Sequence, residues 1–116
     1  MNIEITQLDE TLSVTGQISI DDLADIAQSG FKSVICNRPD LEGGENQPTS
    51  EQLEQEAKAC GMVFAYLPVR MGVIPEERGE AFRKLITELP TPVLAFCGSG
   101  KRAAALHAMT ESKSQE

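Results

Sequence analysis

The sequence of 116 residues has no long apolar run and little positive charge. No stretch approaches the roughly 20 apolar residues that a membrane-spanning helix needs. Residues 1–4 lack the basic segment and the apolar core that begin a secretion signal. We therefore expect a cytoplasmic protein with no membrane partner. With 18 acidic against 10 basic residues and a net charge of −8, the chain is a poor general partner for nucleic acid, so any anion must be held by a local site.

Cysteine and histidine are also scarce, with three residues of the first kind and one of the second. An odd number of cysteines without a Cys-x-x-Cys pair does not indicate a disulfide framework or a structural zinc site. Because His107 has no second histidine beside it, we predict no metal site and expect this side chain to be exposed or satisfied by packing. Nothing in the sequence calls for a cofactor. The remaining question is which thiol, Cys36, Cys60 or Cys97, has chemistry.

Strand and helix patterns alternate along the chain, which favours a single α/β domain over residues 1–116. The period-two pattern at the start predicts a hairpin at a sheet edge, and the later apolar runs predict buried strands. The expected strands are 3–7, 12–14, 31–36, 62–69 and 92–96. Since helix-length segments separate the later strands, we expect a mostly parallel central sheet flanked by helices on both faces.

Capping residues and glycines mark the ends of the expected helices. The first begins at Ser19 and ends at Gly30, and the second begins at Thr49 or Ser50 and ends at Gly61. The third begins at Pro75, and the last runs over 102–108. Their inward faces should carry Leu23, Ile26, Ala27, Leu53, Ala57, Cys60, Phe82, Leu85, Ile86 and Leu89. Residues 110–116 are expected to fray.

The most informative segment is the hexapeptide from Cys97 to Arg102, which separates a buried strand from the start of a helix. Ligands of open α/β sheets bind beyond the carboxyl ends of the strands, where helix N-termini point. Gly98 and Gly100 can adopt backbone angles that are closed to other residues. Their amides, with those of two neighbours (Ser99 and Lys101), can then converge on an oxyanion.

Arg102 and Cys97 give this loop its predicted chemistry. A guanidinium offers two parallel donors to a tetrahedral oxyanion. Amides and a helix N-terminus stabilise a thiolate, so we predict that Cys97 is a nucleophile. The alternative is a plain tight turn with Cys97 as a small buried residue. The strand before the loop and the helix after it favour the functional interpretation.

A Cys-x-x-Gly-x-Arg loop after an apolar strand resembles the active loop of cysteine-based phosphatases and of rhodanese-like sulfurtransferases. Further segments, among them Asn-Arg-Pro-Asp at 37–40, Gln-Pro at 47–48 and Leu-Pro-Val at 67–69, make nearly the whole chain resemble a bacterial group, the beta-lactamase-hydrolase-like protein phosphatase-like family. The resemblance implies a dual-specificity-phosphatase-like sheet, with Cys97 as nucleophile and Arg102 as oxyanion clamp. Members of that family are described both as phosphatases and as sulfur transferases.

Three features of the chain depart from the usual phosphatase pattern. The loop has one residue fewer than that of the usual phosphatase, and its length is the one usual in rhodaneses that carry sulfur as a persulfide. Ala103 replaces the Ser or Thr that eases departure of the thiolate. The segment 67–72 lacks the general-acid Asp that phosphatases place before the cysteine. Sulfur transfer needs no such acid, whereas release of an alkoxide does.

Three residues outside the loop are further candidates. Asp40 could protonate a leaving group or could simply pair with Arg38 or Arg102, and the structural role is favoured. Arg38 could steer an anion to the site or be a solvated turn residue. Cys36 could resolve an oxidised or persulfidated Cys97, although a buried structural thiol is the favoured interpretation.

These observations support three hypotheses. The first is a cysteine-dependent phosphatase that acts on a small anionic substrate or a phosphorylated protein through Cys97. The second is a sulfurtransferase or persulfide carrier that uses the same thiol. The third is a module that binds an anion without turnover. Because the chain ends soon after the last helix, where relatives of the fold often add another, that side would be covered by more chain or by a second copy in a homo-oligomer.

Overall fold

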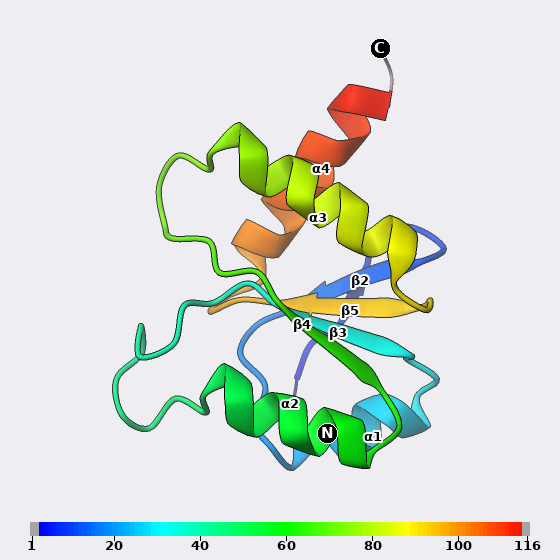
Figure 1. Ribbon diagram of the computed structural model, residues 1–116, viewed down its shortest axis with the longest axis vertical. Coiled ribbons are helices and arrows are strands. Elements are labelled where there is room, and N and C mark those ends of the chain that lie inside the picture. The colour runs from blue at the N-terminus through cyan, green and yellow to red at the C-terminus, as the bar shows by residue number, and fades with distance from the viewer. Residues whose placement is uncertain (1–2, 115–116) are drawn as a thin grey trace.

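The computed structural model describes the backbone of residues 3–114 and the side chains of residues 3–111. A five-stranded sheet, in the order β1-β2-β5-β3-β4, forms the middle layer of the molecule (Figure 1). Its strands are β1 (Thr6–Gln7), β2 (Leu12–Thr15), β3 (Ser33–Cys36), β4 (Val63–Tyr66) and β5 (Val93–Phe96). All neighbours pair in parallel except β1 and β2, which are antiparallel. The expected edge hairpin and mostly parallel sheet are thus confirmed.

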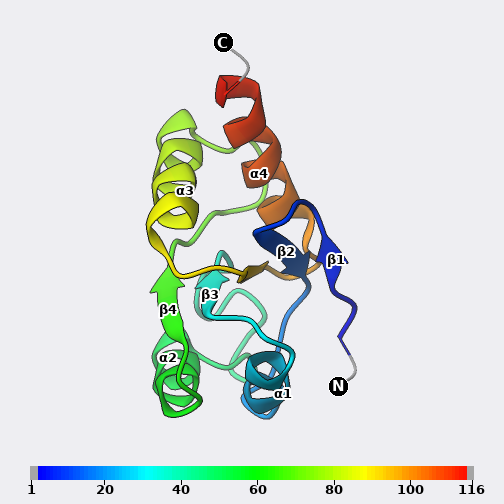
Figure 2. The same cartoon turned by 90° about the vertical axis from the view of Figure 1, so that its right-hand side faces the viewer.

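Helices cover both faces of this sheet, as predicted. Helices α1 (Asp22–Gln28) and α2 (Ser50–Ala59) lie on one face, and α3 (Glu76–Glu88) and α4 (Lys101–Ser114) lie on the other (Figure 2). Alternate residues of the central strands point to opposite faces. On β5, Leu94 and Phe96 pack with α1 and α2, whereas Val93 and Ala95 pack with α3 and α4. Every residue predicted to face inward from a helix packs into one of these two cores.

The structure confirms the predicted starts of α2 and α3, whereas α1 begins later than predicted. Thr49 caps α2 in a capping box with Gln52, and Pro75 precedes α3. Helix α1 begins at Asp22 rather than near Ser19, whose backbone N–H donates to the Asp22 carboxylate at 2.8 Å. Of the expected capping box only the bond from the Ser19 N–H to the Asp22 side chain is formed. The residues between Ser19 and Asp22 therefore make a turn that precedes the helix.

Several predicted boundaries are wrong. The strands predicted over 3–7 and 31–36 begin at Thr6 and Ser33. The strand predicted over 62–69 ends at Tyr66, because the proline at position 68 has no N–H to donate to a ladder. The last helix continues to Ser114 instead of fraying from residue 110. Thr110 is buried and its hydroxyl donates to the His107 carbonyl at 2.7 Å, while the side chain of Met109 packs against α3 at Gly79. Tertiary packing therefore extends this helix. Positions 115–116 of the predicted tail lie outside the described residues.

No helix in the described part of the chain combines the length and the apolar character needed to cross a membrane.

Candidate active site

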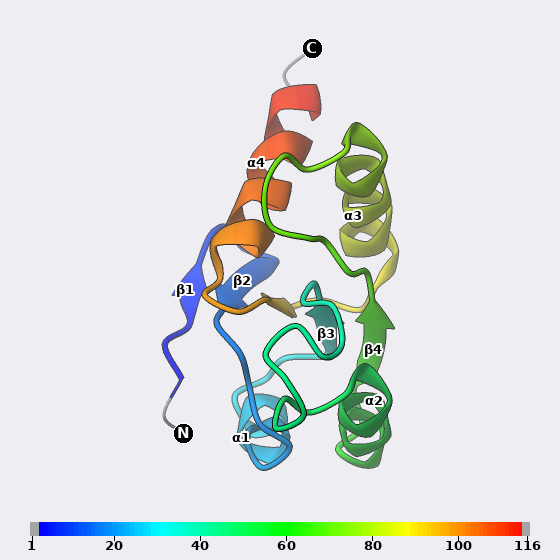
Figure 3. The same ribbon diagram turned by 90° about the vertical axis from the view of Figure 1, so that its left-hand side faces the viewer.

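The loop after β5 places Cys97 at the carboxyl edge of the sheet, which faces the viewer in Figure 3. Cys97 is completely buried, and its Sγ accepts a hydrogen bond from the backbone N–H of Gly100 at 3.0 Å. Gly100 has φ +91°, in the left-handed region that favours glycine, and this conformation turns its amide toward the sulfur. The N–H of Lys101 donates to the Ser99 hydroxyl at 3.4 Å. The loop thus directs one of the four predicted amide donors at the thiol itself.

The end of β2 holds this loop in place. The N–H of Cys97 donates to the Thr15 carbonyl at 3.4 Å, and the N–H of Gln17 donates to the Gly98 carbonyl at 3.3 Å. A Cβ at Gly16 would lie 3.1 Å from the Gly98 oxygen, so only glycine fits between the two segments without displacing one of them. The position of the thiol therefore depends on a chain segment about 80 residues earlier in the sequence.

Arg102 is held by a carboxylate that the sequence did not single out. Its Nη1 and Nη2 donate to the two oxygens of Glu42 at 2.8 and 2.6 Å, and Nη1 also donates to the Val69 carbonyl at 2.8 Å. Both side chains are largely shielded, with 12% of Arg102 and 17% of Glu42 exposed. The hydrogen bond from Arg102 holds the pKa of Glu42 below its usual value, and in turn the carboxylate raises the pKa of Arg102. This pair is a fixed part of the site rather than a loose surface contact.

The geometry of a guanidinium then shows which edge Glu42 and Val69 leave unused. The Glu42 and Val69 contacts engage both hydrogens of Nη1 and one of Nη2. Nε–H and the second Nη2 hydrogen, which lie on one edge of the planar group, are not used by these contacts. Nη2 lies 3.2 Å from where a Cβ on Gly98 would be, so this group lies against the loop. The Cys97 thiol is among the groups that interact with Arg102 there.

Arg38 lies beside the same loop. Its Nε donates to Glu42 at 3.1 Å and its Nη1 donates to the Gln17 side chain at 3.2 Å. Nε also lies 3.4 Å from where a Cβ on Gly98 would be. The structure thus brings the predicted anion-binding residue to the loop, but as a second partner of Glu42.

Asp40 has other partners than those predicted. Its two oxygens accept hydrogen bonds from the backbone N–H and the hydroxyl of Ser50 at 2.8 and 2.9 Å, at the start of α2. Its own N–H donates to the Tyr66 hydroxyl at 2.9 Å. The predicted pairing of Asp40 with an arginine is therefore wrong, because Glu42 holds both of them. The predicted catalytic role of Asp40 stays a prediction.

The backbone between the two acids explains why they separate. Leu41 has φ +68°, a conformation that costs a non-glycine residue about 1–2 kcal/mol. The chain reverses direction at this residue, with Asp40 bonded to α2 on one side and Glu42 bonded to the arginines on the other. Nothing in the local pattern distinguishes Glu42 from other acids of this polar loop, and the pairing with Arg102 spans 60 positions. Sequence reasoning therefore missed it.

The other two cysteines belong to the core. Cys36 is buried opposite Phe96 on β5, and burial raises the pKa of its thiol to about 12. Its Sγ donates to the Arg38 carbonyl at 3.4 Å. Cys60 is partly buried and packs against the core on the α1 and α2 side. Cys36 as a resolving thiol stays a prediction.

His107 lies on α4 more than one helical turn beyond Arg102. It is buried, and its Nε2 is 2.9 Å from a carboxylate oxygen of Asp9 in the β1–β2 turn, so packing and a hydrogen bond satisfy it. Asp9, His107 and Glu111 bring one ligand atom each within 4.8 Å of one another, and in the described part of the chain they are the group that could hold a metal ion. Their place on α4 and the hairpin turn indicates a link between these elements.

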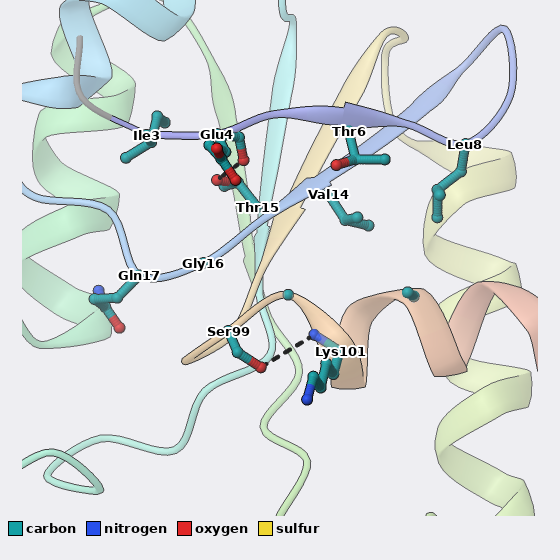
Figure 4. A pocket seen from close by; sticks show the side chains of 12 residues that line it. Ile3, Glu4, Thr6, Leu8, Val14, Thr15, Gly16, Gln17, Ser99 and Lys101 are labelled. Atoms are coloured by element: carbon teal, nitrogen blue, oxygen red, sulfur yellow. Dashed lines mark hydrogen bonds between the residues drawn. The ribbon is translucent and has the colours of Figure 1, made fainter.

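One hollow adjoins the Cys97 loop, and a second lies among the segments that follow β3 and β4. One, of about 490 Å³, lies between the N-terminal strand and the loop. Figure 4 shows Ile3, Glu4 and Thr6 on one side of β2, with Ser99 and Lys101 on the other. The second, of about 620 Å³, lies beyond β3 and β4 and includes Val69 in its wall. The Val69 carbonyl also accepts from Arg102, although Arg102 itself does not line this hollow.

The sequence predicted that this mostly parallel α/β sheet, with the Cys97–Arg102 loop at its carboxyl edge, has the dual-specificity-phosphatase-like fold, and solved structures confirm it. A Neisseria meningitidis protein described as a "putative phosphatase" superposes with a TM-score of 0.82 at 41% identity, over 88% of this chain and 72% of that one. The core catalytic domain of the PP-IP phosphatase SIW14 from S. cerevisiae superposes with a TM-score of 0.69 over 88% of this chain and 60% of that one. At 15% identity the second likeness concerns the fold alone.

Residues 4–114 match the family described as beta-lactamase hydrolase-like protein, phosphatase-like domain, and the chain belongs to this family. A beta-lactamase hydrolase-like protein of Agrobacterium fabrum is 34% identical over 110 residues, which cover 95% of this chain and 25% of that protein. A relative from Xylella fastidiosa is 33% identical over 94% of this chain and 25% of its own length. The chain therefore spans about a quarter of the length of the curated relatives that it matches. The family predicted from the motifs is confirmed.

Proposed function

We propose that this protein is a cysteine-dependent phosphatase that hydrolyses a phosphate ester through Cys97. The observation that carries the proposal is the divided guanidinium of Arg102. Glu42 accepts from Nη1 and Nη2, and the edge with Nε and the second Nη2 hydrogen, beside Gly98 and the Cys97 thiol, is the one we propose for an oxyanion. Donors that are held in place before the substrate arrives stabilise developing charge without having to reorganise.

The reaction has two steps. The Cys97 thiolate attacks phosphorus, an S–P bond forms as the ester P–O bond breaks, and the leaving oxygen takes a proton from water. A water molecule then attacks the same phosphorus, the S–P bond breaks, phosphate leaves and the thiolate returns. Arg102 and the amides of the loop, at Gly98, Ser99, Gly100 and Lys101, are proposed to hold the equatorial oxygens throughout.

Hydrolysis of p-nitrophenyl phosphate by the Cys97→Ser variant tests this proposal. We expect wild-type turnover to be lost in this variant, because an uncharged hydroxyl replaces the thiolate. Cys60→Ser is the matched control, since Cys60 is a partly buried thiol outside the loop, and should retain turnover. Equal activity of Cys97→Ser and the wild type would contradict the proposal.

Sulfur transfer is the second candidate function, favoured by the short loop and by Ala103. The Ala103 side chain is fully buried in the core against α3, so no hydroxyl assists the thiolate from that position. In this reaction the Cys97 thiolate attacks the outer sulfur of thiosulfate, the S–S bond breaks, sulfite leaves and a persulfide remains on the protein. Intact mass after incubation with thiosulfate, without reducing agent, should then show one added sulfur that is absent from Cys97→Ser. An unmodified mass would contradict this candidate.

A further inference from the structure

A group of three ionisable side chains lies outside the Cys97 site, where the β1–β2 turn meets α4 (Figure 2, Figure 3). It consists of Asp9 from the turn and of His107 and Glu111 from α4. The imidazole Nε2 is 2.9 Å from Oδ2 of Asp9 and 3.5 Å from Oε1 of Glu111. One ring nitrogen and two carboxylate oxygens, each a ligand atom for a divalent metal ion, therefore lie together.

Two of these three ligand atoms come from one face of α4. His107 and Glu111 are four residues apart, a spacing that makes their side chains neighbours on a helix. The His107 side chain is 9% exposed, whereas the Glu111 side chain is 59% exposed. Packing therefore fixes the imidazole, while the carboxylate at the outer end of the pair is accessible to an ion from solvent.

The third ligand, Asp9, is held in place by its own turn. Its Oδ1 accepts hydrogen bonds from the N–H and the hydroxyl of Thr11 at 2.8 and 3.0 Å, and from the N–H of Leu12 at 2.8 Å. These bonds occupy one carboxylate oxygen and direct the other, Oδ2, at His107. Ligating carboxylates in metal sites are typically oriented by hydrogen bonds of this kind from the surrounding protein. The turn thus positions Asp9 as a ligand before an ion arrives.

The spacing of the three ligand atoms fits a metal ion. Nitrogen and oxygen ligands bind Zn²⁺ at about 2.0–2.2 Å, so two ligands of a tetrahedral site lie roughly 3.4 Å apart. The three atoms here all lie within 4.8 Å of one another, and the two distances from Nε2 are 2.9 and 3.5 Å. A small rotation of the exposed Glu111 side chain completes the geometry. The ion would take the place of the hydrogen between Nε2 and Asp9, because a metal ion and a proton compete for the same lone pair.

We propose that Asp9, His107 and Glu111 bind Zn²⁺, which ties the β1–β2 turn to α4. One imidazole with two carboxylates suits Zn²⁺ better than Mg²⁺ or Ca²⁺, which prefer sites made of oxygen alone. Three protein ligands leave the fourth tetrahedral position to water. The sequence predicted no metal site because no second histidine stands beside His107, whereas the fold supplies carboxylates instead, one of them 98 positions away. This site does not depend on the proposed phosphatase function.

Calorimetric titration of Zn²⁺ into the chelator-treated Cys97→Ser protein tests the site, since this background lacks a thiol that could itself bind zinc. We expect one ion per chain, and an affinity at least about tenfold lower when Glu111→Gln or Asp9→Asn is added, because each removes an anionic ligand at nearly constant size. Asparagine keeps an oxygen that can accept from Thr11, so the turn is preserved. Glu10→Gln is the matched control, an exposed acid next to Asp9 outside the group, and should bind like its parent.

Thermal unfolding of the same proteins gives a second measurement. Zn²⁺ at a hundredfold excess over its Kd should raise the Tm by about 10 °C, and this rise should disappear in Glu111→Gln. Mg²⁺ at the same concentration should leave the Tm unchanged. The absence of both binding heat and a Tm shift would overturn the proposal. Equal zinc affinity in Glu111→Gln, Asp9→Asn and Glu10→Gln would place the ion elsewhere and overturn it too, and an equal Tm shift with Mg²⁺ would overturn the assignment to zinc.

Discussion

Asp40 and Glu42 are carboxylates two residues apart in the same loop, and the structure gives them unlike partners. Asp40 accepts two hydrogen bonds from Ser50 at the start of α2, whereas Glu42 accepts from Arg102 and Arg38 beside Cys97. The first stabilises a helix end and the second positions a proposed catalytic guanidinium. The comparison shows that Asp40, which belongs to the Asn-Arg-Pro-Asp motif, anchors the loop to α2. Glu42, which belongs to no motif, holds Arg102 beside Cys97.

Substitution of Glu42 should have the largest effect. In Glu42→Gln the amide NH₂ would face the guanidinium of Arg102 with a donor where the carboxylate had an acceptor. The Nε and Nη2 edge of Arg102 would then lose its fixed position. A misplacement of about 1 Å at such a group costs about a hundredfold in rate. We expect kcat/KM for p-nitrophenyl phosphate to fall by about that factor.

Glu45→Gln provides the control for that substitution, since Glu45 is an exposed acid in the same loop and should behave like the wild type. If Glu42→Gln retained full activity, Glu42 would be a merely structural partner of the arginines and the contrast with Asp40 would fail.

The pH dependence of stability sharpens the same contrast. Because its folded pKa is held below the unfolded value, Glu42 contributes stability that is fully present above the unfolded pKa of about 4.5 and is lost as pH falls through the folded pKa. Urea unfolding of the wild type should therefore show stability falling from about pH 5 downward, with a shallower fall in Glu42→Gln. Identical slopes in the two proteins would contradict the assigned ion pair.

Removal of the Asp40 carboxylate should act on stability. In Asp40→Ala the N–H and hydroxyl of Ser50 lose their partner, and we expect a loss of about 1 kcal/mol in the free energy of unfolding. Asp21→Ala is a matched control, because Asp21 stands at the start of α1 without a side-chain capping bond. A loss of kcat in Asp40→Ala as large as that in Glu42→Gln would instead support the catalytic role predicted for Asp40.

Asp9 is a third carboxylate with fixed partners, and its substitution should have the smallest effect on turnover, because Asp9 bonds to the β1–β2 turn and to His107 rather than to the Cys97 loop. Burial raises its pKa, but hydrogen bonds from Thr11, His107 and Leu12 outweigh this and lower the pKa to about 2. The stability that it contributes is present above its unfolded pKa near 3.8 and disappears as pH falls toward 2. In Asp9→Asn the free energy of unfolding, measured by urea titration, should fall less steeply with pH between about 4 and 2. An unchanged pH dependence would show that the bond between Asp9 and His107 does not stabilise the fold.

Much of the fold followed from short-range patterns. The alternation at the N-terminus, the apolar runs and the capping residues around Thr49 and Pro75 placed the strands and helices, because each element is encoded by its own neighbours. The end of α4 was wrong for the opposite reason. Its last turns are stabilised by Met109, which packs against Gly79 of α3, 30 positions earlier, and a local count of apolar residues does not reveal such a contact.

The sequence by itself determined the Cys97–Arg102 loop, its place between a strand and a helix, and the family, since these depend on adjacent residues whose spacing is visible along the chain. Only the tertiary structure decided that Glu42, 60 positions away from Arg102, holds the guanidinium, and that Val69 and Val73 line one hollow beyond β3 and β4. Which of several equivalent acids turns inward is fixed by the backbone at Leu41 and by the burial of two arginines. Both are long-range consequences of folding.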